Sequence, residues 1–272
     1  MRSARLAQAL ETGLFHLPPQ GQIVVLRPRI GDELSDLPRD RLLVATGFRP
    51  DHDWFAARGY ATAPRATEAC AAAIVCLPRA KALARAMLAE AAALVTEGGP
   101  VVVDGQKTDG IDAVLKDLRG RVGLSETLSK AHGKLAVFAA GAQLSDWAAH
   151  QTEVDGFTTL PGVFSADGID RGSALLAAAL PADLKGRVAD LGAGWGYLSR
   201  TVLSRPAVKE CHLVEAEADA LDCARLNIVD DRAQFYWADA TTWKAPRGMD
   251  HIVTNPPFHT GRGADPALGA GF

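Results

Sequence analysis

The chain has 272 residues, 48% of them hydrophobic, and a formal net charge of -3, so it is long enough for two compact domains that each bury a core. No apolar run approaches the roughly 20 residues of a membrane helix, and the amino terminus lacks the apolar stretch of a signal peptide. The four cysteines are spaced too irregularly for a redox or zinc pair, so we expect reduced core cysteines, no metal, no membrane and a cytoplasmic protein.

The first part of the chain alternates short apolar runs with amphipathic segments. The apolar runs, which we predict to be buried strands, span residues 23–26, 42–45, 72–77, 101–103 and 135–139. Between the third and the fourth run, residues 80–95 are rich in helix-forming residues and begin just after Pro78. This alternation predicts a parallel sheet.

The second part of the chain repeats this pattern. We predict strands at residues 188–191, 210–214, 234–237 and 251–254, and helices at residues 173–180, 197–203 and 218–228. We therefore expect an α/β fold of two tandem domains, 1–152 and 153–272, that arose by an ancient duplication.

A glycine-rich turn joins the strand at 188–191 to the following helix. It runs from Asp190 to Gly196 with the sequence Asp-Leu-Gly-Ala-Gly-Trp-Gly, and its glycines let the backbone turn tightly and approach a ligand closely. The turn by itself suits an adenosine-containing cofactor, a dinucleotide or merely a tight connection. The residues expected to contact a cofactor here are Asp190, Gly192, Ala193, Gly194 and Gly196.

The next two strands also end in carboxylates. Glu215, followed by Ala216, ends the strand at 210–214, where a carboxylate can accept hydrogen bonds from both hydroxyls of a cofactor ribose. Asp239, followed by Ala240, closes the strand at 234–237 and could accept a hydrogen bond from an adenine amine. An NAD site would explain Glu215 equally well, and a solvated loop carboxylate would explain Asp239.

The deciding motif is Asn255-Pro256-Pro257-Phe258, directly after the strand at 251–254. Its prolines fix the backbone and remove two N–H donors. The asparagine oxygen and a proline carbonyl can accept hydrogen bonds from an amino group, whose nitrogen lone pair then attacks a methyl sulfonium in line. Phe258 offers a face for a flipped-out base. A rigid turn that caps the strand is the structural alternative.

These four residues are our predicted catalytic group, and S-adenosylmethionine is the predicted cofactor. His259 follows them, but methyl transfer from a sulfonium to an amine needs little proton removal before the attack. We therefore interpret His259 as a residue of the substrate loop rather than as a catalytic base.

With these motifs and the segment 160–173 (Leu-Pro-Gly-Val-Phe-Ser-Ala-Asp-Gly-Ile-Asp-Arg-Gly-Ser), the chain resembles the bacterial ribosomal RNA guanine-N2 methyltransferases of the small-subunit methyltransferase C type, from about residue 72 onward. The resemblance implies two Rossmann-like class I methyltransferase domains and a guanine of ribosomal RNA, free or in the small ribosomal subunit, as the target. It also implies that the segment 160–173 helps to enclose the methionine end of the cofactor, through Phe164, Asp170, Gly172 and Ser173. Read without the resemblance, Ser173 is a plausible helix N-cap. We expect a monomer.

The resemblance further implies that the first domain is a degenerate copy that supports the second and helps to bind RNA. It lacks the glycine motif, and it has only Cys76-Leu77-Pro78-Arg79 where the second domain has Asn-Pro-Pro-Phe. Basic residues that could contact phosphates, although solvated surface charge would explain any one of them, are Lys107, Arg119, Arg121, Lys130 and Lys134. Methyltransferases of this type continue past this motif with a helix and three strands, so we expect a second domain that is truncated after its fourth strand.

Three alternatives stay open at this point. An Asn-Pro-Pro-aromatic motif also serves methyltransferases that act on other planar amines, such as adenine in DNA or glutamine in a protein. A non-catalytic RNA-binding or assembly factor could keep the cofactor pocket without turnover. An NAD-dependent oxidoreductase would explain the glycine turn and Glu215 but gives no role to Asn255.

Overall fold

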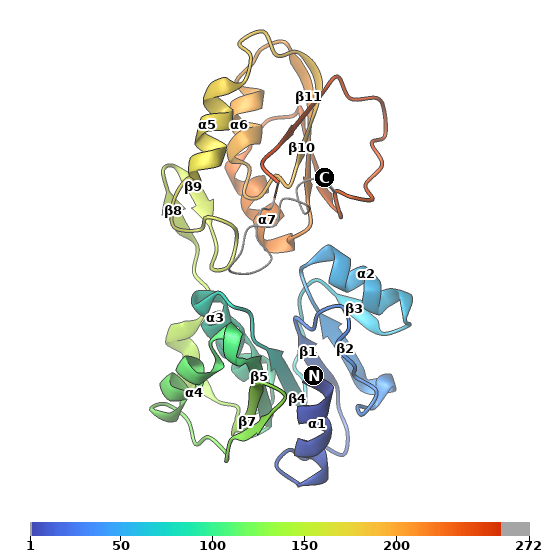
Figure 1. Ribbon diagram of the computed structural model, residues 1–272, viewed down its shortest axis with the longest axis vertical. Coiled ribbons are helices and arrows are strands. Elements are labelled where there is room, and N and C mark those ends of the chain that lie inside the picture. The colour runs from blue at the N-terminus through green and yellow to red at the C-terminus, as the bar shows by residue number, and fades with distance from the viewer. Residues whose placement is uncertain (1, 257–272) are drawn as a thin grey trace. The chain divides into compact units, whose positions relative to one another are not determined.

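The computed structural model describes residues 2–256, and the chain divides into two compact units, Met1–His150 and Gln151–Phe272. Each unit is a sheet with helices packed against it (Figure 1). Among the described helices, none is both long enough and apolar enough to cross a membrane.

The first unit is built on a seven-stranded sheet in the order β3-β2-β1-β4-β5-β7-β6. Its strands are β1 (Ile23–Leu26), β2 (Leu42–Ala45), β3 (Ala61–Ala63), β4 (Ala72–Cys76), β5 (Pro100–Gln106), β6 (Leu128–Lys130) and β7 (Gly133–Ala139). Its helices are α1 (Arg2–Glu11), α2 (Arg49–Ala57), α3 (Lys81–Leu94) and α4 (Ile111–Arg119), with the 3-10 helices η1 (Arg39–Arg41), η2 (Lys107–Asp109) and η3 (Ala142–Trp147).

The prediction of a parallel sheet is correct for β1, β2, β4 and β5 but wrong for β7, and the short strands β3 and β6 were not predicted. Strand β7 runs antiparallel to both β5 and β6. The cause is the tight connection between β6 and β7, where Ala131 and His132 both have positive φ, 50° and 58°. Two consecutive positive φ values are typical of a two-residue hairpin turn, which forces its strands to be antiparallel.

The apolar strands of the first unit are buried on both faces, because helices cover each face. Val24 and Leu26 of β1 pack into one hydrophobic cluster with residues of α3 and α4. Ile23 and Val25 point to the opposite face and pack with residues of α1 and α2. This alternation explains why the strands read as continuous apolar runs in the sequence.

Helix α1 carries two arginines into the interior of the first unit. Arg5 is fully buried, and its Nε and Nη2 donate to the two carboxylate oxygens of Asp104 on β5 at 2.7 and 2.8 Å. Arg2 donates to Asp104 Oδ1 at 2.9 Å and to Asp32 Oδ2 at 3.1 Å. A buried carboxylate is tolerated only with such partners, so this cluster fixes α1 against the sheet.

The second unit has a four-stranded parallel sheet in the order β12-β11-β10-β13, together with a separate two-stranded hairpin. The sheet strands are β10 (Gly186–Leu191), β11 (Val208–Glu215), β12 (Ala233–Trp237) and β13 (His251–Thr254), the hairpin strands are β8 (Thr152–Val154) and β9 (Phe157–Thr159), and the helices are α5 (Arg171–Ala179), α6 (Tyr197–Leu203) and α7 (Ala218–Asn227). All four predicted sheet strands are present, and β13 has the predicted bounds.

The hairpin is fastened to the second unit through the end of α7. Asn227 accepts a hydrogen bond from the Thr158 N–H at 2.6 Å and donates to the carbonyls of Thr158 and Trp195 at 2.9 and 2.8 Å. The Arg200 guanidinium lies 4.3 Å from the centre of the Phe157 ring. One asparagine therefore links the hairpin to the glycine-rich turn that follows β10.

Candidate functional site

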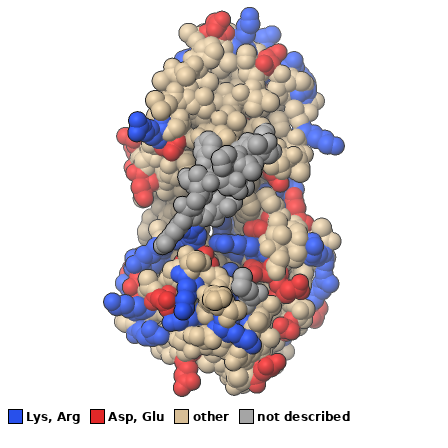
Figure 2. All heavy atoms as spheres, in the orientation of Figure 1, with Lys and Arg blue, Asp and Glu red and all other residues tan. Residues whose placement is uncertain are grey.

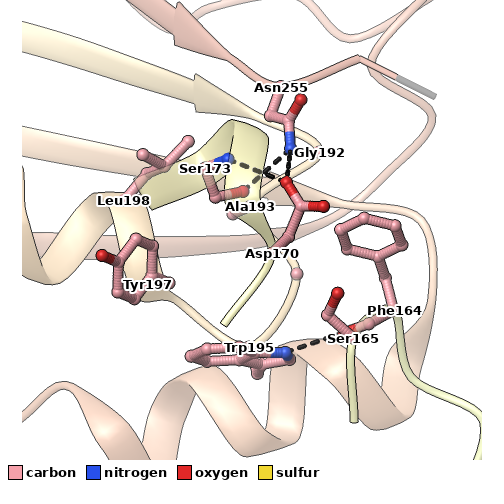
Figure 3. Close-up of a pocket in the computed structure, with 11 residues that line it drawn as sticks. Phe164, Ser165, Asp170, Ser173, Gly192, Ala193, Trp195, Tyr197, Leu198 and Asn255 are labelled. Atoms are coloured by element: carbon pink, nitrogen blue, oxygen red, sulfur yellow. Dashed lines mark hydrogen bonds between the residues drawn. The ribbon is translucent and has the colours of Figure 1, made fainter. Parts of the chain in front are cut away.

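A pocket in the second unit lies where β10 and β13 end and where α5 and α6 begin (Figure 3). The pocket is open to solvent on one side. Its lining residues come from segments far apart in the sequence: Phe164, Ser165, Asp170, Ser173, Gly192, Ala193, Gly194, Trp195, Tyr197, Leu198 and Asn255. Ligands of open α/β sheets bind at this edge, beyond the carboxyl ends of the strands.

The three glycines of the turn after β10 have positive φ but serve different purposes. Gly192, Gly194 and Gly196 have φ of 72°, 56° and 94°. A Cβ at Gly194 would meet no atom within 4 Å, so this backbone borders open space in the pocket. A Cβ at Gly196 would lie 2.8 Å from the Ile228 Cδ1, so this glycine allows α6 to begin close to the end of α7. Gly196 is not among the residues that line the pocket.

Glu215 at the end of β11 holds the glycine turn in place. Its Oε2 accepts a hydrogen bond from the Gly194 N–H at 2.7 Å, and its Oε1 accepts one from the Glu217 N–H at 2.7 Å. Burial raises the pKa of Glu215, against the lowering effect of these two backbone donors. Each carboxylate oxygen can accept a further hydrogen bond, so the predicted contacts with ribose hydroxyls stay possible. Glu215 does not itself line the pocket.

Asp190, the first residue of the glycine motif, is fully buried. Its Oδ2 accepts a hydrogen bond from the Ser199 Oγ at 2.6 Å. Its Oδ1 is buried and has no hydrogen-bond partner among residues 2–256. Burial raises the pKa of Asp190 to about 7, opposed by the Ser199 hydrogen bond and reinforced by the charge of Glu215. An unpartnered buried carboxylate oxygen is uncommon in proteins, which makes Asp190 a candidate functional residue.

Asn255 follows β13 directly, and its side chain reaches α5. The Asn255 Nδ2 donates to Asp170 Oδ2 at 2.9 Å and to Ser173 Oγ at 2.8 Å. Thr254, the residue before it, donates from Oγ1 to the carbonyl of Leu191 at 2.8 Å. The motif after β13 is thus tied both to the glycine turn and to the segment 160–173. Pro256 follows in the described chain, whereas Pro257, Phe258 and His259 lie outside the described residues.

The expectation that Ser173 is the N-cap of its helix is wrong. Helix α5 begins two residues earlier, and the cap is Asp170, whose Oδ2 accepts a hydrogen bond from the Ser173 N–H at 2.8 Å. Asp170 caps the helix because its carboxylate satisfies one of the free N–H groups of the first turn. This leaves the Ser173 hydroxyl available to Asn255.

Phe164 stands at the rim of the pocket with 64% of its surface exposed. Its backbone is nevertheless fixed, because its carbonyl accepts a hydrogen bond from the Trp195 Nε1 at 2.8 Å. Trp195 in turn packs against Phe157 of the hairpin and against Tyr197. The pocket therefore has one apolar ring exposed at its mouth and an aromatic cluster behind it.

Seven residues of the predicted cofactor set lie outside the lining of the pocket: Gly172, Asp190, Gly196, Glu215, Ala216, Asp239 and Ala240. Ala216 accepts a hydrogen bond from the Trp237 Nε1 at 2.9 Å. The Asp239 Oδ1 accepts hydrogen bonds from the N–H and the hydroxyl of Thr241, at 2.9 and 2.7 Å. Ala240 packs with a small hydrophobic cluster that includes Tyr236 and Trp243. For these residues, contact with a cofactor stays a prediction.

Sequence reasoning missed four residues of the lining: Ser165, Trp195, Tyr197 and Leu198. Trp195 lies between two glycines of the motif, and its residue type gave no signal that it would line the pocket. Ser165 has a φ of 52°. This left-handed backbone conformation is set by the fold of the segment around Ser165, and no signal in the sequence predicted it.

The basic residues that we singled out in the first unit are in part engaged with the protein. Lys134 pairs with Asp112 and Arg121 with Asp146, each at 2.6 Å, and Arg119 donates to the Thr127 hydroxyl at 3.1 Å. The visible face of the first unit carries both basic and acidic side chains (Figure 2). Among residues 2–256, no group of three or more His, Cys, Asp or Glu side chains could hold a metal ion.

Comparisons with known proteins agree with this geometry. Residues 155–272 match the family described as methyltransferase small domain. The chain is 31% identical over 192 residues to ribosomal RNA small subunit methyltransferase C of Salmonella choleraesuis and to that of Salmonella typhi, an alignment that covers 68% of this chain and 56% of each relative. The chain thus spans little more than half the length of the curated relatives that it matches.

A solved structure is similar over most of the chain. The T. thermophilus 16S rRNA N2 G1207 methyltransferase (RsmC), in complex with AdoMet and guanosine, matches with a TM-score of 0.75 and 25% sequence identity, over 90% of this chain and 73% of that one. This similarity confirms the α/β, Rossmann-like methyltransferase fold that the sequence predicted.

Proposed function

Because this chain belongs to the class I methyltransferases and carries a methyltransferase small domain at residues 155–272, we propose that its second unit binds S-adenosylmethionine and methylates the N2 amine of a guanine in ribosomal RNA. One observation carries the proposal: the Asn255 side chain lies in the same pocket as the glycine turn after β10. The amine acceptor Asn255 and the turn at Gly192, which is 63 positions earlier in the sequence, therefore border one space.

The residues of the pocket fit this cofactor. S-adenosylmethionine, when bound, supplies an electrophilic methyl group on a positively charged sulfonium. Asp170, Asp190 and Glu215 place carboxylates in or beside the pocket, which suits a cationic ligand. The unpartnered Asp190 Oδ1 and the open space beside Gly194 leave room for hydrogen bonds and for close approach.

The chain's own residues position the amine. The Asn255 Oδ1 accepts a hydrogen bond from the guanine N2 amine, and the Pro256 carbonyl accepts a second one. Two acceptors orient the nitrogen lone pair away from the ring plane and toward the methyl group. The amine loses its extra proton after the attack, so no strong general base is required at this stage.

The substrate and the setting follow from the named relatives. The similar proteins are ribosomal RNA small subunit methyltransferases, and the similar structure is that of a 16S rRNA N2 methyltransferase. We therefore infer ribosomal RNA or the small ribosomal subunit as the partner, the cytoplasm as the location, and a monomeric enzyme without a metal. The predicted first domain, residues 1–152, supports the second and helps to bind RNA, and the predicted second domain, residues 153–272, carries the cofactor and the reaction.

The test is methyl transfer from labelled S-adenosylmethionine to ribosomal RNA and to small ribosomal subunits that lack the modification. The wild-type protein transfers label to guanine N2, and Asn255→Ala abolishes transfer while calorimetry shows unchanged cofactor affinity. Thr242→Ala, an exposed threonine of the same unit, is the matched control. Wild-type rates in Asn255→Ala would refute the mechanism, and transfer to DNA adenine or protein glutamine would redirect the substrate.

A further inference from the structure

We propose that Asp170 and Ser173 are positioning residues that hold the Asn255 carboxamide in the single orientation that presents Oδ1 to the substrate amine. This inference rests on the proposed function, because it assigns a role in that site. It adds a role to the expectation, implied by the family resemblance, that Asp170 and Ser173 help to enclose the methionine end of the cofactor, which stays a prediction.

The hydrogen bonds of Asn255 determine its orientation. A carboxamide nitrogen has two N–H donors, and both are used here: one donates to Asp170 Oδ2 at 2.9 Å and the other to Ser173 Oγ at 2.8 Å. Figure 3 shows the nitrogen facing Asp170 and Ser173 while the oxygen points away from both. A flipped amide would place its oxygen against the Asp170 carboxylate, acceptor against acceptor, so the flipped state is disfavoured.

The two partners of Asn255 are themselves fixed. Asp170 Oδ2 also accepts the Ser173 N–H at 2.8 Å, so the carboxylate is both the cap of α5 and the anchor of Asn255. Gly172 lies against the pair: a Cβ there would be 3.0 Å from Asp170 Oδ2 and 3.5 Å from Asn255 Oδ1. A glycine at this position therefore leaves room for the pair and for whatever Oδ1 binds.

This arrangement improves Asn255 as an acceptor in two ways. Without it, rotation of the side chain would expose either the oxygen or the nitrogen, and only the oxygen can accept a hydrogen bond from an amine. With it, the correct group is oriented before the substrate arrives, which lowers the entropic cost of the reactive geometry. In addition, donation to a carboxylate polarises the amide and increases the negative charge on Oδ1.

Kinetics of Asp170→Ala and Ser173→Ala separate this role from cofactor binding. We expect kcat to fall about 10- to 100-fold in Asp170→Ala and less in Ser173→Ala, while the Kd for S-adenosylmethionine stays within twofold of wild type. Asp183→Ala, an exposed aspartate in the same unit, is the matched control. An unchanged kcat, or a loss explained entirely by a higher cofactor Kd, would overturn the proposal.

An exchange of the two groups provides a rescue test. Asn255→Asp alone sets two carboxylates side by side and should be nearly inactive. Adding Asp170→Asn restores the hydrogen bond in the opposite direction, because the new amide at position 170 donates to the new carboxylate at position 255. Asn is also a good helix N-cap. We expect the double variant to be at least tenfold faster than Asn255→Asp. Equal rates would show that the pair does not act through this hydrogen bond.

A spectroscopic test does not depend on activity at all. The sequence contains only two asparagines, Asn227 and Asn255, so labelling with ¹⁵N-asparagine gives two side-chain amide signals, which Asn255→Ala assigns. In Asp170→Ala, the Asn255 signal should move toward that of a free amide and exchange faster with water, while Asn227, held by Thr158 and Trp195, provides the folded reference. An unmoved Asn255 signal would contradict the proposal.

The three tests also separate this inference from the proposed function. If the wild-type protein transfers no methyl group to any RNA, the proposed function fails, and the amide signals still report whether Asp170 holds Asn255. If the wild-type protein is active but Asp170→Ala alters neither kcat nor the Asn255 signal, the positioning role fails while the proposed function stands.

Discussion

The two units share the first four positions of one sheet topology but differ at the ends of the strands. In the first unit the order is β3-β2-β1-β4, and in the second it is β12-β11-β10-β13, with all of these strands parallel. Strands β1 and β10 occupy the third position in these two orders. Their last residues, Leu26 and Leu191, therefore provide a common reference point for comparing the two units. The two units thus share one framework of parallel strands and differ in the residues that follow those strands.

When the two sheets are compared by strand register, Thr46 of the first unit occupies the position equivalent to Glu215 of the second. In the same way, Cys76 is equivalent to Asn255. Glu215 holds the glycine turn, whereas Thr46 is buried and its hydroxyl has no partner among the described residues. Burial raises the pKa of Cys76 to about 12, so its thiol is neither an anion nor a useful amine acceptor at neutral pH. The first unit thus lacks both groups to which the proposed function assigns a role in the second unit.

The backbone turn is retained in the first unit, although its glycine is not. Arg27 follows Leu26 and has a φ of 51°, as Gly192 follows Leu191 with a φ of 72°. Nearby, Arg2 and Asp104 line the same small cavity as Cys76. In the first unit, therefore, α1 contributes a charged cluster at the end of β4, where the second unit has an open pocket.

The largest expected effect comes from making the second unit like the first at its acceptor. Asn255→Cys copies Cys76 and should lower kcat about 100- to 1000-fold, as for other single groups that stabilise a transition state. Cofactor affinity, measured by calorimetry, should persist. A variant that keeps more than a tenth of the wild-type kcat would show that the difference between the strand ends is not catalytic.

The second prediction concerns the buried charged cluster of Arg2, Arg5 and Asp104 in the first unit. Arg5→Ala leaves the Asp104 carboxylate short of a buried partner and should lower the free energy of unfolding by about 3–5 kcal/mol, as measured by urea denaturation. Arg49→Ala, which removes a half-exposed ion pair with Asp53, should cost at most about 1 kcal/mol. Equal losses in the two variants would show that the buried cluster has no special structural role.

The third prediction concerns the turn beside the pocket. Glu215→Thr copies Thr46 and removes the carboxylate that accepts the Gly194 N–H. A hydrogen bond to a charged group contributes about 1.5–3 kcal/mol, so the Kd for S-adenosylmethionine should rise at least about tenfold. Glu153→Thr, on an exposed residue of β8, is the control. Unchanged affinity would remove Glu215 from the cofactor site.

The fourth prediction concerns pH. Because burial raises the pKa of Asp190 from 3.8 to about 7, the folded chain keeps a proton that the unfolded chain loses between about pH 4 and 7. The free energy of unfolding should therefore fall as pH rises through this window, by up to about 1.4 kcal/mol per pH unit from this group. Asp190→Asn, which cannot ionise, should flatten that slope, and Asp183→Asn should not. Parallel slopes in wild type and Asp190→Asn would contradict the assignment.

The sequence predicted those parts of the molecule that depend on local pattern. The apolar runs at β1, β2 and β13 had the observed bounds, and the glycine turn and Asn255 were recognised from residue type and position. The direction of β7 was missed because a two-residue turn at Ala131 and His132 carries none of the usual turn residues. The buried roles of Arg2 and Arg5 were missed because they depend on Asp104, about 100 residues away.

The contact between Asn255 and Asp170 was also missed, because it too joins residues that are distant in the sequence. The two residues are 85 positions apart, and no periodicity or spacing relates the end of one strand to the cap of another element. The resemblance placed both residues in one site but implied a different role for Asp170. Only the folded arrangement indicates that one holds the other.

The central claim is that a single cofactor site exists, in the second unit, at the turn after β10. Calorimetric titration of the protein with S-adenosylmethionine tests it directly. We expect one binding site per chain, lost in Gly194→Val, which would fill the open space beside the turn, and retained in Gly248→Val, an exposed glycine outside the pocket. Two sites per chain, or full binding by a folded Gly194→Val protein, would contradict the account.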